Sequence, residues 1–190
     1  MSRVSTKNLA LAAILTALVV ILQFLGAFIK LGPFSISTVL IPIVVGSAIC
    51  GVGIGAWLGF VFGVVVLLSG DAAAFLAVNV PGTIITVLLK GTLCGLAAGV
   101  VYRLLAKFST YAAVAAAAVV CPIVNTGVFL LGCLLFFMPT VTEWAAAAGL
   151  GENVAQFMIV GLVGLNFLVE MGINIVLSPI IVRLLNARNK

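Results

Sequence analysis

Two charged side chains, Lys90 and Glu170, stand inside apolar stretches of the sequence. A charge near the middle of a bilayer costs at least about 2.5–3.5 kcal/mol, so each needs a partner or a use. Lys90 precedes Arg103 by 13 residues, and Glu170 precedes Arg183 by the same number. At the helical rise of 1.5 Å per residue, both lie roughly 20 Å from these basic residues. Two opposite charges at one depth, on different helices, can meet in one cavity.

Uncharged polar residues accompany the two charges. Asn166 and Asn174 flank Glu170 at i−4 and i+4 and share its helix face. Asn125 lies in the preceding apolar stretch, where a kink at Pro122 can bring it to the depth of the charges. We expect Lys90, Asn125, Glu170 and Asn174 to form a polar ligand pocket. An ion pair of Lys90 with Glu170 that only fixes helix packing is the alternative.

The composition requires lipid as the solvent of this chain. Of its 190 residues, 65% are hydrophobic and 7% are charged, with a mean hydropathy of +1.45. A soluble domain carries about a quarter charged residues. The scattered basic residues, which give a net charge of +5, do not predict nucleic-acid binding.

The same composition argues against catalysis. The chain has no histidine and only four acidic residues, which excludes histidine-dependent triads and leaves no acid–base constellation. The four cysteines lie in apolar runs without a CxxC pair, so we expect neither a metal site nor a cofactor and predict that the protein is not an enzyme.

The apolar stretches predict an all-α fold, a bundle of six transmembrane helices in a single integral membrane domain over residues 1–190. A stretch over residues 72–82, interrupted by Asn79-Val-Pro-Gly, is interpreted as a loop that dips back into the membrane, and residues 139–153 as another loop. Pro42 is interpreted as a kink in the second span. The predicted spans cover residues 8–28, 34–50, 54–68, 83–105, 111–138 and 154–185.

Charge gives the direction of these spans. Seven basic residues fall at the ends shared by the two termini, and Lys30 is the one basic residue in the connections at the other ends, which also hold Asp71, Glu143 and Glu152. By the positive-inside rule both termini are cytoplasmic. The seven basic residues are Arg3, Lys7, Arg103, Lys107, Arg183, Arg188 and Lys190.

Small residues mark the first span. Ala13 and Ala17 form a small-xxx-small pair, which lets another helix approach closely in lipid. Packing inside the chain and an intermolecular docking face are both open interpretations of this pair.

Taken together, the chain resembles the substrate-binding S-components of energy-coupling factor (ECF) transporters, which import vitamins into bacteria across the cell membrane. The resemblance implies a six-helix protein whose Ala13-x-x-x-Ala17 docks onto a transmembrane coupling subunit driven by two cytoplasmic ATPase subunits. It also implies a substrate site in the outer half of the bundle, with Asn79 in one of the loops that contribute to it.

Within the family, Lys90 together with Asn125-Thr126 is similar to the pantothenate-type members, with lysine where arginine is expected. The resemblance therefore implies pantothenate as ligand, with Thr126 beside Asn125 in the site. Riboflavin or another vitamin in the same role is an alternative. A stand-alone secondary transporter coupled to ions through Glu170 is the second alternative.

Overall fold

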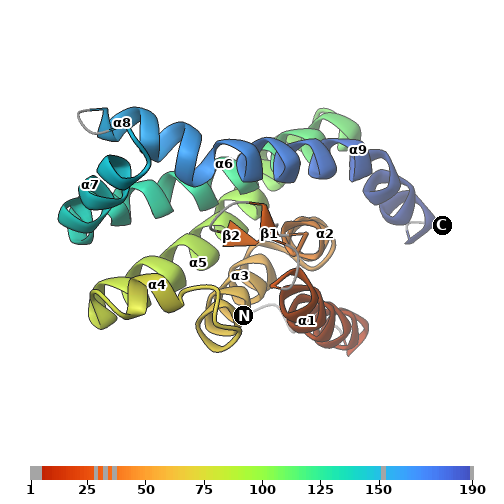
Figure 1. The fold of residues 1–190 in the computed structure, drawn as a ribbon. Coiled ribbons are helices and arrows are strands. Elements are labelled where there is room, and N and C mark those ends of the chain that lie inside the picture. The colour runs from red at the N-terminus through yellow and green to blue at the C-terminus, as the bar shows by residue number, and fades with distance from the viewer. Residues whose placement is uncertain (1–5, 28–29, 32–33, 36–37, 151–152, 189–190) are drawn as a thin grey trace.

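The computed structural model describes residues 6–27, 30–31, 34–35, 38–150 and 153–188. Nearly all of them are helical, which confirms the predicted helical fold (Figure 1). Arg3, Glu152, Lys190 and the predicted span end at residue 28 lie outside the described residues. The elements are α1 (Thr6–Gly26), β1 (Lys30–Leu31), β2 (Phe34–Ser35), α2 (Leu40–Cys50), α3 (Val52–Leu68), α4 (Ala73–Leu76), α5 (Val80–Leu105), α6 (Thr110–Phe136), α7 (Met138–Ala147), α8 (Val154–Gln156), the π-helix η1 (Phe157–Gly164) and α9 (Leu165–Arg188).

Several of these helices are suited to a bilayer. Among the described residues, four apolar helical stretches are long enough to cross a membrane: 6–26, 80–105, 110–136 and 166–183. Three more apolar helical stretches, at 40–50, 52–68 and 154–164, are shorter. The protein is therefore a helical membrane protein, and the count of six spans stays a prediction.

The long helices form a bundle in which each packs on its neighbours in sequence. Helix α5 contacts α3 on one side and α6 on the other, and α6 in turn contacts α9. In Figure 1, α6 and α9 run along one side of the molecule, and α1, α2 and α3 lie on the other side of α5. Helix α5 is thus the central element, and its residue Lys90 faces into the bundle.

The predicted second span, at residues 34–50, was wrong at its start. Residues Phe34–Ser35 pair with Lys30–Leu31 as two short antiparallel strands, and the helix begins only at Leu40. Pro42 therefore lies in the first helical turn and not inside a long span. A residue in the first turn has no intrahelical acceptor for its N–H, so proline costs no hydrogen bond there and no kink is required.

The predicted loop over residues 72–82 was also partly wrong. It contains the short helix α4, and α5 begins at Val80 rather than at residue 83. Asn79 has an extended backbone, and its side chain accepts a hydrogen bond from the N–H of Gly82 at 2.9 Å. Asn79 is thus the N-cap of α5, and Pro81 occupies the first turn, where it is tolerated.

The C-terminal part is more divided than predicted. The predicted loop 139–153 contains most of α7, and α6 ends at Phe136 instead of residue 138. The predicted span 154–185 consists of α8, η1 and α9. Segments of π-helix are rare and frequently occur at functional sites, and the η1 segment precedes the stretch of α9 that carries Glu170.

Glycines bring α3 and α5 into direct backbone contact. A Cβ atom added at Gly59 would overlap the carbonyl of Gly91, and one added at Gly55 would overlap that of Gly95. Further along the same seam, a Cβ at Gly63 would lie 2.8 Å from the carbonyl oxygen of Val87. Small residues allow such an approach in lipid, where van der Waals packing drives helix association.

The buried side chains form two separate hydrophobic clusters. The larger includes residues of α1, α2, α3, α5, α6 and α9, such as Phe62 and Val87. The smaller joins α4, α6, α7 and η1, and includes Phe75, Phe137 and Leu162. Polar side chains lie where the two clusters meet.

Candidate functional site

A cavity lies between the two hydrophobic clusters. The space open to the centre of a water molecule in it is about 90 Å³, which is room for several waters or for part of a small ligand. Its walls come from α3, α4, α5, α6, η1, α9 and the segment between α3 and α4. Three of the lining residues are charged, namely Asp71, Lys90 and Glu170. Five are polar and uncharged, namely Thr83, Thr86, Asn125, Thr126 and Asn166.

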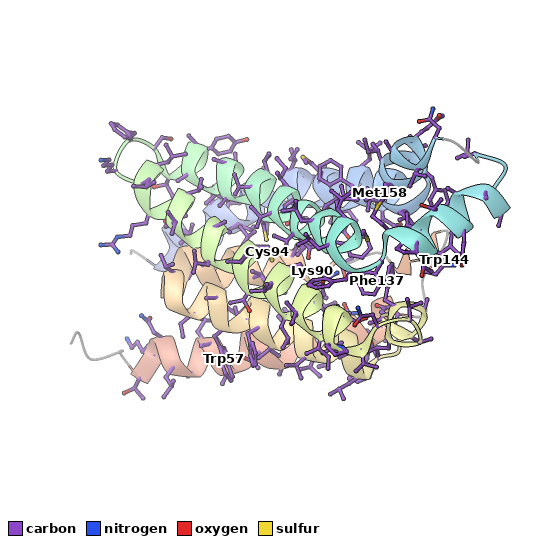
Figure 2. The ribbon with its side chains drawn as sticks, turned by 90° about the vertical axis from the view of Figure 1, so that its left-hand side faces the viewer. Trp57, Lys90, Cys94, Phe137, Trp144 and Met158 are labelled. Atoms are coloured by element: carbon purple, nitrogen blue, oxygen red, sulfur yellow. The ribbon has the colours of Figure 1, made fainter. Side chains whose placement is uncertain are left out.

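Lys90 lies near the middle of the bundle (Figure 2), and its ammonium lies close to two aromatic rings. Its Nζ lies 5.6 Å from the ring centroid of Phe62 on α3 and 5.5 Å from that of Phe129 on α6. A cation within about 6 Å of a ring centroid is attracted by the negative face of the ring. The two rings therefore replace part of the hydration that the ammonium loses inside the membrane.

Two carboxylates reach the same cavity from different elements. Glu170 is 6% exposed on α9, and Asp71 follows the turn at Ser69-Gly70 that ends α3. Gly70 has a φ of 84°, a backbone conformation that favours glycine and that turns the chain towards α4. With Lys90, the described lining residues bring one positive and two negative groups to one space.

Thr86 on α5 and Asn125 on α6 each line the cavity with a polar atom that has no hydrogen-bond partner among the described residues. The atoms are Oγ1 of Thr86 and Oδ1 of Asn125, and both residues are about 5% exposed or less. A buried polar atom without a partner costs about 1–3 kcal/mol. Unpaired atoms on a cavity wall are suited to hydrogen bonds with a bound molecule or with water.

Aromatic rings line one wall of the cavity, next to α4. The ring of Phe75 packs edge-on against Phe129, Phe137 and Trp144, with centroids 5.5, 4.9 and 5.4 Å apart. Of these four residues only Trp144 is not a lining residue. Figure 2 shows Phe137 and Trp144 towards the end of the molecule that α7 occupies. A ligand in the cavity would meet this aromatic wall.

The structure brings four of the six predicted site residues to the cavity. Lys90, Asn125, Thr126 and Glu170 line it, whereas Asn79 and Asn174 do not. Asn79 caps α5, and Asn174 is 1% exposed and donates from Nδ2 to the backbone oxygen of Glu170 at 2.8 Å. Asn174 lies one turn further along α9, away from the cavity.

Sequence reasoning missed Asp71, Thr83 and Thr86 as lining residues. Thr83, Thr86 and Lys90 are spaced by three and four residues, so they share one face of α5, and this spacing was a signal that the sequence contained. For Asp71 the sequence offered no such signal, because the other polar lining residues begin at Thr83, 12 positions further along the chain.

The predicted docking pair lies on the surface. Ala13 and Ala17 are exposed on α1, whereas Ala12, Leu15 and Val19 on the same helix are buried. The pair therefore does not pack inside the described part of this chain, and it leaves a small-residue surface open to another helix.

No group of three or more potential metal ligands occurs among the described residues. The bundle and the polar cavity define the class of the protein, a helical membrane protein with an internal polar cavity. The family described as "ECF transporter, substrate-specific component" matches residues 7–182, and the chain therefore belongs to this family. No curated protein and no solved structure gave a match. The family is a family of substrate-specific transporter subunits, not of enzymes, and it implies an ECF module and a small-molecule substrate as partners.

Proposed function

We propose that the chain captures a small water-soluble vitamin from outside the cell and serves as the substrate-binding subunit of an ATP-driven ECF importer. The observation that carries the proposal is the cavity in which Lys90 and Glu170 meet unpartnered polar atoms of Thr86 and Asn125. A purely structural membrane subunit would leave this arrangement without a use, because intramembrane polar groups are costly.

Pantothenate is the vitamin that we propose first. Its carboxylate suits the ammonium of Lys90, and its hydroxyl and amide groups suit Thr86 and Asn125. Asp71 and Glu170 add negative charge to the same walls, which favours hydroxyl and amide donors of the ligand. Riboflavin, another vitamin of this kind, could use the aromatic wall and the same amide and hydroxyl groups.

The proposed assembly places both termini in the cytoplasm of a bacterium, with the chain as a multi-pass protein of the cell membrane. Lys7, Arg103, Lys107 and Arg183 are exposed, as expected of residues at the cytoplasmic ends of spans. The exposed Ala13 and Ala17 would dock onto a transmembrane coupling subunit. Two cytoplasmic ATPase subunits would then supply the energy, because the chain has no Walker A motif.

Mass spectrometry of small molecules that copurify with the protein tests this proposal directly. We expect a vitamin, bound tightly and without nucleotide. Lys90→Ala and Glu170→Gln should each weaken its binding about 10-fold or more, because a hydrogen bond to a charged group contributes about 1.5–3 kcal/mol. Unchanged affinity in both variants would leave these residues only a packing role.

Reconstitution of the chain alone separates import by a complex from secondary transport. Liposomes that contain only this protein should not accumulate the vitamin when an ion gradient is applied. Accumulation driven by the gradient would instead support a stand-alone transporter coupled through Glu170.

A further inference from the structure

The buried face of α1 carries one polar side chain. Its buried residues are Ala12, Leu15, Val19, Gln23 and Gly26, which recur at the spacing of one helix face. Gln23 is only 2% exposed. Burying an amide is costly unless it is hydrogen-bonded, so its partner should have a definite role.

The hydrogen-bond partner of Gln23 is Asp71, a residue of the cavity wall. Nε2 of Gln23 donates to Oδ2 of Asp71 at 2.5 Å, and Oγ of Ser69 lies 3.5 Å from the same nitrogen. Asp71 lines the cavity, whereas Gln23 does not. A hydrogen bond to an ionised carboxylate is stronger than one between neutral groups, and it fixes the direction of the acceptor.

We infer that Gln23 is a positioning residue, which holds the Asp71 carboxylate at the cavity wall and thereby links α1 to ligand binding. The turn at Gly70 brings Asp71 to the wall, and the Gln23 amide from α1 donates to its Oδ2 there. This hydrogen bond favours one orientation of the carboxylate. In that orientation the carboxylate can accept from a hydroxyl or amide donor of a ligand.

The helix that carries Gln23 also carries the exposed pair Ala13 and Ala17. Gln23 lies six residues beyond Ala17 on the same helix, about 9 Å along its axis. If that pair docks onto a coupling subunit, as the proposed function has it, a shift of α1 acts on the Asp71 carboxylate through Gln23. Coupling between two sites is reciprocal, so ligand binding in turn favours one position of α1.

The test uses Gln23→Met, which keeps the length of the side chain and removes the donor, in the full-length protein in lipid nanodiscs. Hydrogen–deuterium exchange over residues 69–73 reports the positioning without any ligand. We expect exchange there to rise about 10-fold, the equivalent of a lost hydrogen bond to a charged group. Leu15→Met, a volume-conserving change on the same buried face, is the matched control and should leave this segment unchanged.

Titration with pantothenate provides the second arm. We expect Gln23→Met to change the affinity at least about 3-fold in the otherwise natural chain and less than about 2-fold in an Asp71→Ala background, as for two coupled residues. Equal effects in both backgrounds, or unchanged exchange over residues 69–73, would overturn the inference. If the natural chain does not bind pantothenate, the proposed ligand fails, and the exchange experiment alone decides the role of Gln23.

Discussion

Replacing Thr86 with valine tests whether one hydroxyl binds the ligand, because its loss should affect ligand affinity and protein stability differently. The two side chains have nearly the same shape, and the change removes Oγ1, which has no hydrogen-bond partner among the described residues. Thr86 is 4% exposed and lines the cavity. If the hydroxyl binds the ligand, its loss removes one neutral hydrogen bond, about 0.5–1.5 kcal/mol. At 1.4 kcal/mol for each factor of ten, the vitamin should bind roughly 2- to 12-fold more weakly.

Stability should respond differently. The natural protein without ligand already carries the cost of burying this hydroxyl, so Thr86→Val should leave the unfolding midpoint unchanged or raise it. Isothermal titration calorimetry measures the affinity, and a thermal shift of the unliganded protein measures the stability.

Thr92 provides the matched control for this experiment. It lies on the same helix outside the cavity, and its Oγ1 donates to the carbonyl of Leu88 at 2.7 Å. Thr92→Val should therefore leave the affinity unchanged. Equal affinity of Thr86→Val and the natural protein, or a loss of stability without a loss of affinity, would refute the assignment of Thr86 to the ligand.

Two further predictions concern the surfaces of α3 and α1. Gly59→Ala should lower the unfolding midpoint, because its Cβ would overlap the Gly91 carbonyl and overpacking costs about 1–3 kcal/mol. The control, Gly53→Ala, has no atom within 4 Å of its Cβ and should leave the midpoint unchanged. Equal midpoints of the two variants would argue against the tight helix contact. Ala13→Trp should abolish vitamin uptake by cells while the purified protein still binds the vitamin. The control, Val176→Trp, lies on the exposed side of α9 and should leave uptake unchanged. Normal uptake by Ala13→Trp would remove the docking role.

The sequence predicted the helical fold and part of the cavity because charge in a membrane is rare. Lys90 and Glu170 could be placed at one depth by counting residues from the basic ends of their helices, and the structure has both at one cavity. The same reasoning failed for Asn174, because helical spacing to Glu170 gives the face of a residue but not its depth relative to a cavity.

Local hydrogen bonding explains the other differences. Asn79 was predicted as a loop residue near the site. An asparagine shortly before a proline at a helix start is also suited to capping, and in the structure its side chain caps α5. The contact of Gln23 with Asp71 joins residues 48 positions apart, and only the packing of α1 against α3 brings them together. A single sequence contains no signal for such a pair.

The glycine seam between α3 and α5 has a consequence for how firmly the lysine is held. Where two backbones touch without intervening side chains, neither helix can slide or turn independently. Lys90, next to Gly91, is therefore held in place by main-chain contacts rather than by flexible side chains. The main chain at Lys90 therefore keeps its position when a ligand arrives. Little affinity is then lost to ordering the helix that carries the ammonium, which is the advantage of a preorganised receptor.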